Sequence, residues 1–551
     1  MTSHCRTRVA SSFLYALLGV AMLPLFVGAA SAQISVTSAS PSSAAQATVN
    51  LNVTVNGKGF KRGAHAQWFV TGTTNPGGIT VNSTAFVSST QLTANITVAD
   101  TADIAQFDIQ VANSDGRIGK GTELFSVTVT QSNGSKTSSC PVPTPKLATV
   151  TSCTSTLAGC LDTTFGVGGI AITNPNGQGK IPLLQVDGKI VVLGFSRSTT
   201  TGVDFNLVRY NSDGSLDSSF GNGGIVTDAV TAVDDYVYAG ALQSDGKILA
   251  AGYAGGETYM AVARFNPDGT LDATFGSGGN VLMNLATHQK LPSAAWTLAL
   301  QSDGKILLGG EPSKVVRLNS NGSMDTTFGN QGSVSLAVRA LTTQRVTSGT
   351  VTEERILAAK GGTVTRLTSS GSVDASFGPN LNGTVSADVC GSALSIAVDA
   401  ANNIVVAGVD GSPLNFGLAR YTPNGIPDST FGDPVPGSAQ RTGRTRVSFF
   451  GNNDRVYGLA IQGDGKLLVS GNAEGPNIST TYYIYFALAR FNPDGSLDTS
   501  FGIGGLVATA APTPSGNAIG TGVALQPDGK IVMAGNADGT PSRFAVVRYW
   551  P

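Results

Sequence analysis

Apolar and polar residues alternate in short runs between residues 33 and 129. The runs are LNVTV at 51–55, AQWFV at 66–70, QLTANITV at 91–98, FDIQV at 107–111 and LFSVTV at 124–129. Because successive side chains of a strand point to opposite faces, each run predicts a strand with one buried face. The turn dipeptides Asn56-Gly57 and Asp115-Gly116 lie between the runs. We therefore expect residues 33–129 to form a β-sandwich.

This segment resembles the IPT/TIG family of immunoglobulin-like domains. The resemblance lies in SPSSAAQATVNLNVTVNGKGFKRGAHAQW at 40–68, TVNSTAFVSSTQLTANITV at 80–98 and FDIQVANSDGR at 107–117. It implies an Ig-like fold that serves as a spacer or a binding module, and it supplies no catalytic residues.

From residue 161 to the end, the chain is one repeat. Copies read NSDGSLDSSFGNGG at 211–224, NPDGTLDATFGSGG at 266–279 and NPDGSLDTSFGIGG at 492–505. The Phe-Gly dipeptide recurs at intervals of 55, 55, 53, 49, 54 and 70 residues, at Phe165, Phe220, Phe275, Phe328, Phe377, Phe431 and Phe501. A period near 50 residues is typical of propellers and solenoids.

The unit from Phe220 to Phe275 shows how many strands one period holds. The apolar runs GIVTDAV, VYAGALQS, KILAAGY and TYMAVARFN follow one another, with an Asp245-Gly246 turn between the second and the third. Asp-Gly between apolar runs indicates a hairpin, because the tight turn needs positive φ. Four strands in each of seven units predict an all-β fold with a seven-bladed β-propeller over residues 161–551.

Residues 161–551 resemble the delta-60 repeat proteins, a β-propeller family of bacterial exported chains. The resemblance lies in the recurring motifs QxDGKI, R(F/Y)NxDGSLD and FGxGG. It implies a propeller fold and no established activity.

The repeat begins and ends in mid-unit, which bears on how the ring closes. It starts with LDTTFG at 161–166 and stops at Arg548-Tyr549-Trp550-Pro551. We expect GGIAIT at 168–173 to be the outer strand of a blade whose other three strands are C-terminal. Such an overlap would remove two free sheet edges. The alternative is an open six-bladed ring with frayed ends.

The first 32 residues have the pattern of a secretory signal peptide. Arg6 and Arg8 precede an apolar stretch at 13–27, and Ala30-Ser31-Ala32 is a small-x-small cleavage site. An uncleaved membrane anchor is the alternative. No later segment is long and apolar enough to span a bilayer. We therefore expect a secreted or cell-surface protein.

Residues 130–160 are rich in Ser, Thr and Pro and predict a linker. They include Cys140, Cys153 and Cys160. An exported protein can form disulfides, so we expect one bridge among these three, with its connectivity left open. A metal site is the weaker alternative, because no His lies nearby.

Composition excludes several functions. The 34 Lys and Arg residues nearly balance the 35 Asp and Glu residues, so the chain lacks the basic surplus of a nucleic-acid binder. Neither a GxSxG nucleophile elbow nor a P-loop is present. We therefore assign no catalytic residue, no metal and no cofactor. Calcium bound by loops such as NPDGTLD is a weak alternative, since turn chemistry explains the same residues.

Two residue types recur at fixed places in the repeat. An Asp precedes each Phe-Gly by three residues, and an Arg closes each third strand; the members are Asp162, Asp217, Asp272, Asp325, Asp374, Asp428 and Asp498, and Arg209, Arg264, Arg317, Arg366, Arg420, Arg490 and Arg548. Sialidase-like arginines with Asp-box-like loops are the functional interpretation. Because a catalytic site is needed once whereas fold symmetry needs every copy, we favour a buried structural pair.

The longest interval, of 70 residues, has its surplus at 433–455 and 471–485. We interpret the first segment as a connection between a fourth strand and the next first strand, and the second as a connection between a second and a third strand. Both would then lie on one face. Arg441, Arg444, Arg446, Tyr482, Tyr483 and Tyr485 are candidate ligand-binding residues there. A tolerated surface insertion is the alternative.

Together these features favour an exported, non-enzymatic binding or scaffold protein whose propeller recognises an extracellular glycan or protein. The alternative is a secreted propeller hydrolase or lyase that acts on polysaccharide. A cluster of two or three carboxylates with an Arg or Tyr in the central channel would favour the enzyme, and a channel lined by Gly, Ala and Leu would favour the binding protein. The sequence indicates neither the particular ligand nor an oligomeric state.

Overall fold

The computed structural model describes residues 33–46, 48–99, 102–103, 105–128, 156–285, 293–348, 351–386, 391–411, 413–475, 483–513, 517–537 and 542–551. Regular structure in these residues is all β, with no α-helix and hence no helix that could cross a membrane. The chain divides into two compact units, residues 1–133 and 134–551. The expected signal peptide, residue 129 of the expected Ig-like domain and residues 130–155 of the expected linker lie outside the described residues.

Unit 1 consists of two four-stranded sheets, ordered β1-β3-β6-β5 and β2-β8-β7-β4. The strands are β1 (Ser35–Ser40), β2 (Ser43–Ala45), β3 (Leu51–Lys58), β4 (His65–Val70), β5 (Ile79–Ser88), β6 (Gln91–Val98), β7 (Gln106–Ala112) and β8 (Ile118–Thr128). Alternate residues of β6 are buried, as the period of two predicts. They join a single core in which Trp68 packs edge-on against Phe125 at 5.9 Å.

Unit 2 contains seven four-stranded antiparallel sheets. Their strands are β10 (Gly177–Leu184), β11 (Ile190–Arg197), β12 (Val203–Tyr210), β13 (Ile225–Asp228); β14 (Tyr236–Leu242), β15 (Ile248–Ala254), β16 (Tyr259–Phe265), β17 (Asn280–Met283); β18 (Ala294–Leu300), β19 (Ile306–Glu311), β20 (Lys314–Leu318), β21 (Ser333–Ser335); β22 (Ala340–Ser348), β23 (Val351–Lys360), β24 (Thr363–Leu367), β25 (Thr384–Ser386); β26 (Gly391–Val398), β27 (Ile404–Asp410), β28 (Asn415–Tyr421), β29 (Arg444–Val447); β30 (Asp454–Ile461), β31 (Leu467–Glu474), β32 (Ile484–Phe491), β33 (Leu506–Thr509); and β34 (Ala518–Leu525), β35 (Ile531–Ala537), β36 (Arg543–Tyr549), β9 (Ile170–Thr173).

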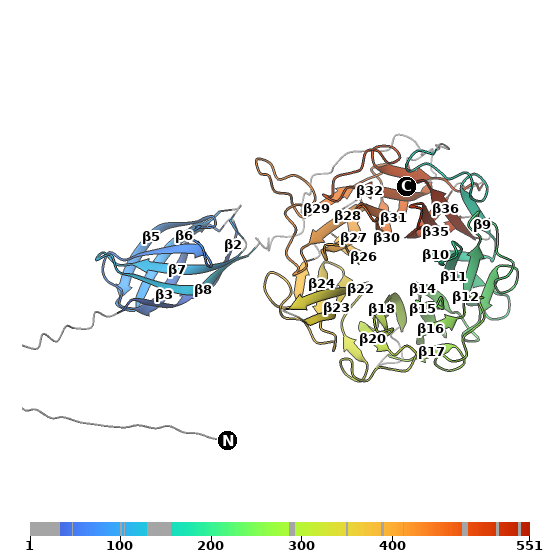
Figure 1. The fold of residues 1–551 in the computed structure, drawn as a ribbon, viewed down its shortest axis with the longest axis horizontal. Helices are drawn as coiled ribbons and strands as arrows, with labels where there is room; N and C mark the ends of the chain where they lie inside the picture. Colours follow the sequence, from blue (N-terminus) through green and yellow to red (C-terminus); the bar gives the residue numbers. More distant parts are fainter. Residues whose placement is uncertain are drawn as a thin grey trace, which may run out of the picture. The chain divides into compact units, whose positions relative to one another are not determined.

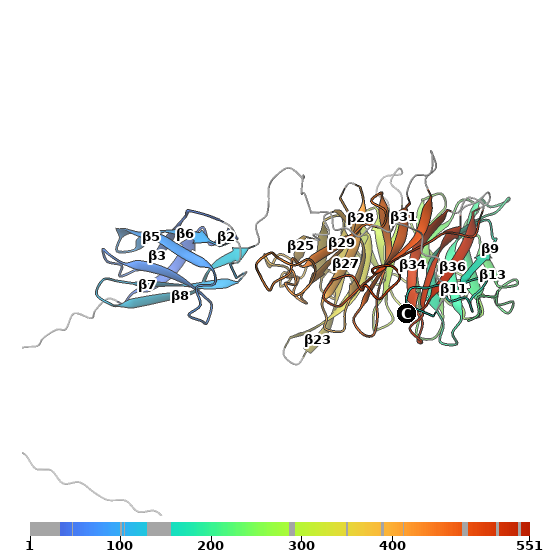
Figure 2. The same ribbon diagram turned by 90° about the horizontal axis from the view of Figure 1, so that it is seen from above.

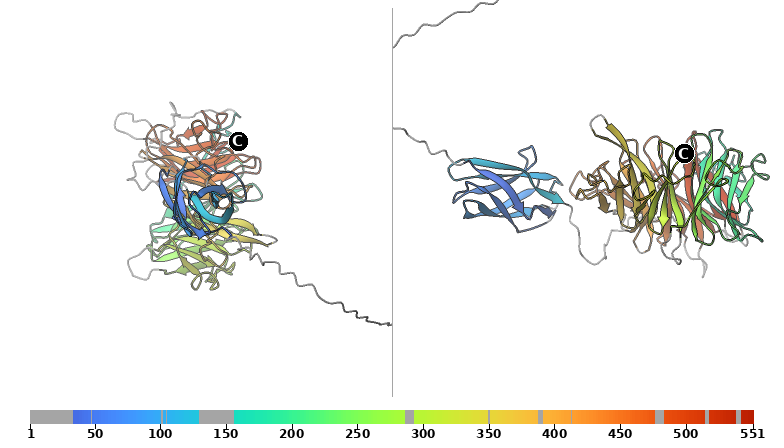
Figure 3. Two further views of the ribbon diagram at one scale, coloured as in Figure 1. Left: turned by 90° about the vertical axis from the view of Figure 1, so that its left-hand side faces the viewer. Right: turned by 90° about the horizontal axis from the view of Figure 1, so that it is seen from below.

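The sheets of unit 2 are arranged around a common centre (Figure 1). We call the first strand of each sheet its inner strand: β10, β14, β18, β22, β26, β30 and β34. Each inner strand contacts the next one, and β34 contacts β10. Seen from the side, the strands run across the thickness of unit 2, and the hairpin of β22 and β23 extends beyond its neighbours (Figures 2 and 3).

Most residues of the second and third strands are buried, with the first half of β23 as the main exception. All residues of β12 and β15 are buried, because each sheet packs between two others. One core cluster joins Val191 and Phe205 of the first sheet to Val237 and Ile248 of the second. Apolar burial between sheets of this kind is the main favourable term in folding.

The last sheet combines both ends of unit 2. Strand β9 pairs with β36 from Ile170↔Val547 to Thr173↔Phe544. A core cluster then joins this sheet, through Phe544, to Val192 of the first. These are the strands for which the sequence analysis expected an overlap.

The last residues before the repeat also belong to unit 2. The Gly159 amide donates to the Trp550 carbonyl at 2.9 Å, and the Gly502 amide donates to the Ala158 carbonyl at 2.9 Å. Cys160 is disulfide-bonded, and all the other cysteines lie outside the described residues. Residues 156–160, which were expected to be linker, are therefore packed onto this unit.

Candidate functional site

The repeated Arg and Asp residues contact each other in every sheet of unit 2. Each Arg Nε donates to an Asp Oδ2 at 2.6–2.9 Å, in the pairs Arg209–Asp217, Arg264–Asp272, Arg317–Asp325, Arg366–Asp374, Arg420–Asp428, Arg490–Asp498 and Arg548–Asp162. Each guanidinium also lies 4.3–4.7 Å from the ring of a Phe-Gly phenylalanine. This is the contact that the repeat predicts.

The same arginines connect one sheet to the next. Arg264 Nη1 donates to the Ser320 carbonyl, and Arg317 Nη1 to the Ser369 carbonyl, both at 2.5 Å. The two carbonyls belong to turns of the following sheets. Because these contacts recur from sheet to sheet, the repeated pair is explained by the fold and does not single out one functional place.

Hydrogen bonds keep the paired carboxylates ionised. The bond from Lys247 lowers the pKa of Asp272 most; burial raises it, and Thr274 and Arg264 lower it further. Burial also raises the pKa of Asp498, but donors that include Ser500 and Lys466 outweigh it and lower the pKa to about 2. The pairs are therefore charged at neutral pH.

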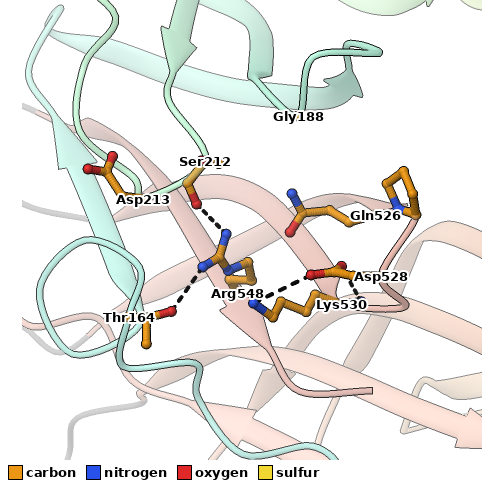
Figure 4. Close-up of a pocket in the computed structure, with 9 residues that line it drawn as sticks. Thr164, Gly188, Ser212, Asp213, Gln526, Asp528, Lys530 and Arg548 are labelled. Carbon is orange, nitrogen blue, oxygen red and sulfur yellow. Dashed lines mark hydrogen bonds and ion pairs between the residues drawn. The ribbon is translucent and has the colours of Figure 1, made fainter.

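A pocket lies between turns of the first and last sheets of unit 2, and its two cations, Arg548 and Lys530, are already engaged (Figure 4). Arg548 pairs with Asp162 at 2.8 Å and donates to Thr164 Oγ1 at 3.2 Å and to the Ser212 carbonyl. Lys530 pairs with Asp162 at 3.2 Å and with Asp528 at 3.4 Å. The pocket is thus one copy of the structural pair, at the place where the two chain ends meet.

The structure corrects the expected position of the first long segment. The fourth strand of its sheet is β29, which begins at Arg444, so residues 433–443 connect a third strand to a fourth. Successive connections of an antiparallel sheet alternate between its two ends. The expectation that the segment 433–455 shares a face with the connection between β31 and β32 is therefore wrong for residues 433–443. Residues 448–453 do connect a fourth strand, β29, to the next first strand, β30, and Asn452 Nδ2 donates to the Gly475 carbonyl at 2.8 Å.

The candidate arginines of that segment make internal contacts. Arg441 pairs with Asp494 at 2.6 Å and donates to the Gly432 carbonyl at 2.6 Å. Arg446 is buried and pairs with Asp410 at 3.3 Å. Arg444 lies in β29, opposite Ala419 of β28. Arg441 and Arg446 are therefore held by carboxylates of the protein itself.

The candidate tyrosines lie beside the same core. Tyr485 is 8 % exposed and packs on Phe450 with the ring centroids 5.6 Å apart. Tyr483 is partly buried against the same cluster, and Tyr482 lies outside the described residues. Packing accounts for Tyr483 and Tyr485 without a ligand.

A different set of side chains stands out on the inner strands. Six of the seven inner strands have a register shift at the same place, and β22 has none. The extra residues, which we call the bulge ring, are Lys180, Tyr238, Trp296, Leu394, Tyr457 and Thr521. A bulge re-aims the side chain of its extra residue. All six are partly or fully exposed, whereas the residue that precedes each of them is buried.

Aromatic rings continue from the bulge ring across three sheets. We call Phe195, Tyr236, Tyr238, Tyr253 and Trp296 the aromatic arc. The ring centroids are 4.4 Å apart for Phe195–Tyr236, 4.9 Å for Tyr236–Tyr253, 5.9 Å for Tyr238–Tyr253 and 4.5 Å for Tyr238–Trp296. These spacings are in the range of favourable aromatic pairs.

A cation lies at each end of the aromatic arc. Lys180 Nζ is 5.3 Å from the centroid of Phe195, and the Arg339 guanidinium is 4.4 Å from that of Trp296. Lys180 donates to Gln178 Oε1 at 2.9 Å, and burial alone lowers its pKa to about 8. Arg339 interacts electrostatically with Tyr238, with Tyr457 and with Glu311.

Carboxylates are nearly absent from the inner strands. Asp454 is the single acidic residue among their described positions. It is fully buried, it accepts from the Phe449 amide at 3.0 Å, and burial raises its pKa to about 7. The described residues also contain no group of three or more His, Cys, Asp and Glu that could hold a metal ion. In the NPDGTLD loop, Asp268 accepts from the Thr270 amide at 2.9 Å.

Sequence reasoning missed the bulge ring and the aromatic arc. One signal was present, because the inner strands read QGKIP, YVYAG, AAWTL and RVYGL at equivalent places. The repeat keeps Arg and Asp constant but changes the bulged residue from blade to blade. Variation at a fixed structural place indicates a role that the fold does not require.

The fold and its repeated pair define a β-propeller repeat protein. Six segments, residues 185–220, 243–275, 301–328, 402–431, 462–501 and 526–551, match a family described as "Domain of unknown function (DUF5122) beta-propeller". These six segments of the chain are therefore similar to the repeats of this β-propeller family.

Solved structures with a similar fold differ widely in their described roles. A structural genomics protein of unknown function from Bacteroides thetaiotaomicron VPI-5482 is 10 % identical, covers 94 % of this chain and 99 % of its own, and has a TM-score of 0.27. The WD40 repeats of RRP9 are 11 % identical, cover 69 % of this chain and 97 % of their own, and have a TM-score of 0.40. A thermostable family-43 glycoside hydrolase is 10 % identical, covers 56 % of this chain and 88 % of its own, and has a TM-score of 0.23. At such values they carry no argument about function. The search of curated proteins gives no match.

Proposed function

We propose that this chain is an exported binding protein. It consists of an IPT/TIG-like immunoglobulin domain, a linker and a closed seven-bladed propeller of the delta-60 type, and the propeller binds an extracellular glycan on the aromatic arc and the bulge ring. Export rests on the signal-peptide pattern of residues 1–32. The two sheets around one core in unit 1 support the Ig-like assignment.

Three contacts support a closed ring of seven blades. Strand β9 completes the sheet of β34, β35 and β36, inner strand β34 contacts β10, and one core cluster spans the first and last sheets. An open ring would leave these strand edges and apolar faces exposed to water.

The observation that carries the glycan proposal is the aromatic arc, in which Tyr253 is buried and the other four rings are partly exposed, at positions where the repeat varies. Flat aromatic surfaces pack against the C–H faces of sugar rings, and Tyr hydroxyls offer hydrogen bonds at the edge of such a surface. The Tyr238–Trp296 contact, at 4.5 Å, bridges two adjacent sheets. A rigid inner ring therefore supplies a broad platform without a mobile loop.

The hydrolase or lyase alternative has less support. Glycoside hydrolysis needs two carboxyl groups placed on either side of the scissile bond. The described positions of the inner strands offer Asp454 alone, and it is buried and hydrogen-bonded.

A glycan array probed with the full chain tests the proposal. We expect binding that falls at least tenfold in Tyr238→Ala and Trp296→Ala, with the melting temperature within a few degrees of the parent. Trp550→Ala is the matched control, because Trp550 is also partly exposed and stacks on Lys530 at 4.7 Å beyond the end of β36. Absence of glycan binding, or equal losses in Trp296→Ala and Trp550→Ala, would refute the proposal.

A further inference from the structure

We propose that the glycan is anionic, with carboxylate or sulfate groups that meet Lys180 and Arg339 at the two ends of the aromatic arc. This inference rests on the proposed glycan-binding function and adds the charge of the ligand to it. Uronate and sulfated polysaccharides are the ligand class that combines acidic groups with sugar rings.

Lys180 differs from the other lysines of the repeat. In five sheets a turn lysine pairs with the repeated Asp: Lys189–Asp217, Lys247–Asp272, Lys305–Asp325, Lys466–Asp498 and Lys530–Asp162, at 2.8–3.7 Å. Lys180 has no ion pair among the described residues, and its one hydrogen bond goes to the neutral Gln178. A partly buried ammonium without a counter-ion is unfavourable for folding. It becomes favourable when an anion binds.

Arg339 is in a comparable position at the other end of the arc. Each of the seven repeated arginines has its own Asp, whereas Arg339 stacks on Trp296 and forms no ion pair among the described residues. The acid near it, Glu311, is taken by Lys360 at 3.0 Å and by the Ser313 amide at 3.1 Å. The guanidinium edge is therefore available for a bidentate contact with a carboxylate or sulfate.

Acidic groups of the protein lie beside the middle of the arc and set where the ligand's charges go. Asp234 and Glu257 interact electrostatically with Tyr253. Asp234 Oδ1 already accepts from the Val203 amide at 2.9 Å. Because like charges repel, anionic groups are favoured at the ends of the arc, and uncharged ring faces fit its tyrosine-rich middle.

The test uses a glycan array that holds uronate, sulfated and neutral glycans, followed by the best-binding uronate and its carboxyl-reduced form. We expect the binders to be acidic and carboxyl reduction to weaken binding at least tenfold. Lys180→Met and Arg339→Gln each weaken binding of the acidic glycan at least fivefold, and Lys180→Arg retains it. Arg345→Gln is the control: Arg345 is exposed on β22, the strand that follows Arg339, but toward the far end of that strand, and the change is expected to alter binding less than twofold.

Three outcomes would overturn the inference, and the first two are distinguishable from each other. If neutral and acidic glycans bind equally and Lys180→Met has no effect, the ligand is uncharged and glycan binding itself stands. If the parent binds no glycan, the proposed function fails and this inference fails with it. A binding constant that does not weaken between 50 mM and 500 mM salt would also argue against an ionic contact.

Discussion

Arg264 illustrates what the repeated pair contributes at the scale of one residue. It is 7 % exposed, pairs with Asp272 at 2.8 Å, donates to the Ser320 carbonyl and stacks on Phe275. Its removal leaves a buried carboxylate whose remaining ionic partner is Lys247, 2.8 Å away. The pair therefore fixes both the turn of its own sheet and the contact with the next.

We expect Arg264→Ala to lower the free energy of unfolding by about 3–5 kcal/mol, the usual cost of removing one partner of a buried pair. Urea unfolding of the full chain at pH 7 measures the change. Arg345→Ala, at an exposed position, is the control and should change stability by less than about 0.5 kcal/mol. A loss below about 1 kcal/mol in Arg264→Ala would show that the pair is not structural.

For Lys180 we expect the opposite effect: removing its charge should raise the free energy of unfolding. Its pKa is lowered from 10.5 to about 8 in the folded chain, so the folded state binds fewer protons than the unfolded state between these pH values. Stability therefore rises with pH through this window, and the charged form is a penalty below pH 8. We expect Lys180→Met to raise the unfolding free energy by about 1–3 kcal/mol at pH 7 and by less at pH 10.

Thermal unfolding at the two pH values measures this difference. Lys247→Met is the contrast, because Lys247 has a carboxylate partner and its loss should destabilise the protein at pH 7. If Lys180→Met destabilised the protein to the same degree at both pH values, Lys180 would have an ordinary packing role, and the argument for an unmatched charge would fail.

At the scale of the element, the strands were predictable and one connection was not. Period-two runs and Asp-Gly turns are local signals, and the predicted run KILAAGY at 247–253 coincides with β15. The sequence analysis placed residues 433–443 after the fourth strand, whereas they precede β29, because no GxGG turn follows Phe431 to mark where the fourth strand begins. In the other sheets an Arg amide donates to the last Gly of that turn, as Arg264 does to Gly279; Arg420 donates instead to Gly443, 2.9 Å away.

Gly443 thus takes the place of the last Gly of the turn, and residues 433–442 are an insertion ahead of the fourth strand.

The bulge ring could not be located from the sequence for a related reason. A bulge depends on how two strands pair, and the sequence of β14 or β15 alone does not determine the register between them.

The corrected position of the insertion yields a prediction for this element. Replacing residues 433–442 with the short turn of the 220–275 unit should leave glycan binding within twofold and the melting temperature within a few degrees. The Arg441–Asp494 pair that it removes is partly exposed, at 28 % and 42 %, and such pairs contribute little. A glycan array and a thermal scan of this variant check it. A tenfold loss of binding would indicate that the glycan binds at residues 433–442.

At the scale of the molecule, unit 2 depends on contacts between residues that are far apart in sequence. Asp162 pairs with Arg548 and Lys530, and Leu161 forms a bridge with Tyr549. Each sheet buries its faces against two neighbours, so a missing strand also weakens the sheets on either side. The proposed closure makes the two ends of the unit act as one cooperative element.

We expect deletion of residues 161–173 to destabilise the whole of unit 2 and not only its last sheet. The deletion removes β9, leaves the edge of β36 unpaired from Phe544 to Val547 and takes Asp162 from the buried Arg548 and Lys530. No other described strand pairs with that edge. Urea unfolding followed by tryptophan fluorescence and circular dichroism should show a lower midpoint and a broader transition. The replacement of residues 433–442 is the control, because it shortens the chain by a similar length away from the seam. If the truncated protein unfolded with the midpoint and cooperativity of the parent, the ring would not be closed through β9, and the count of seven blades would be wrong with it.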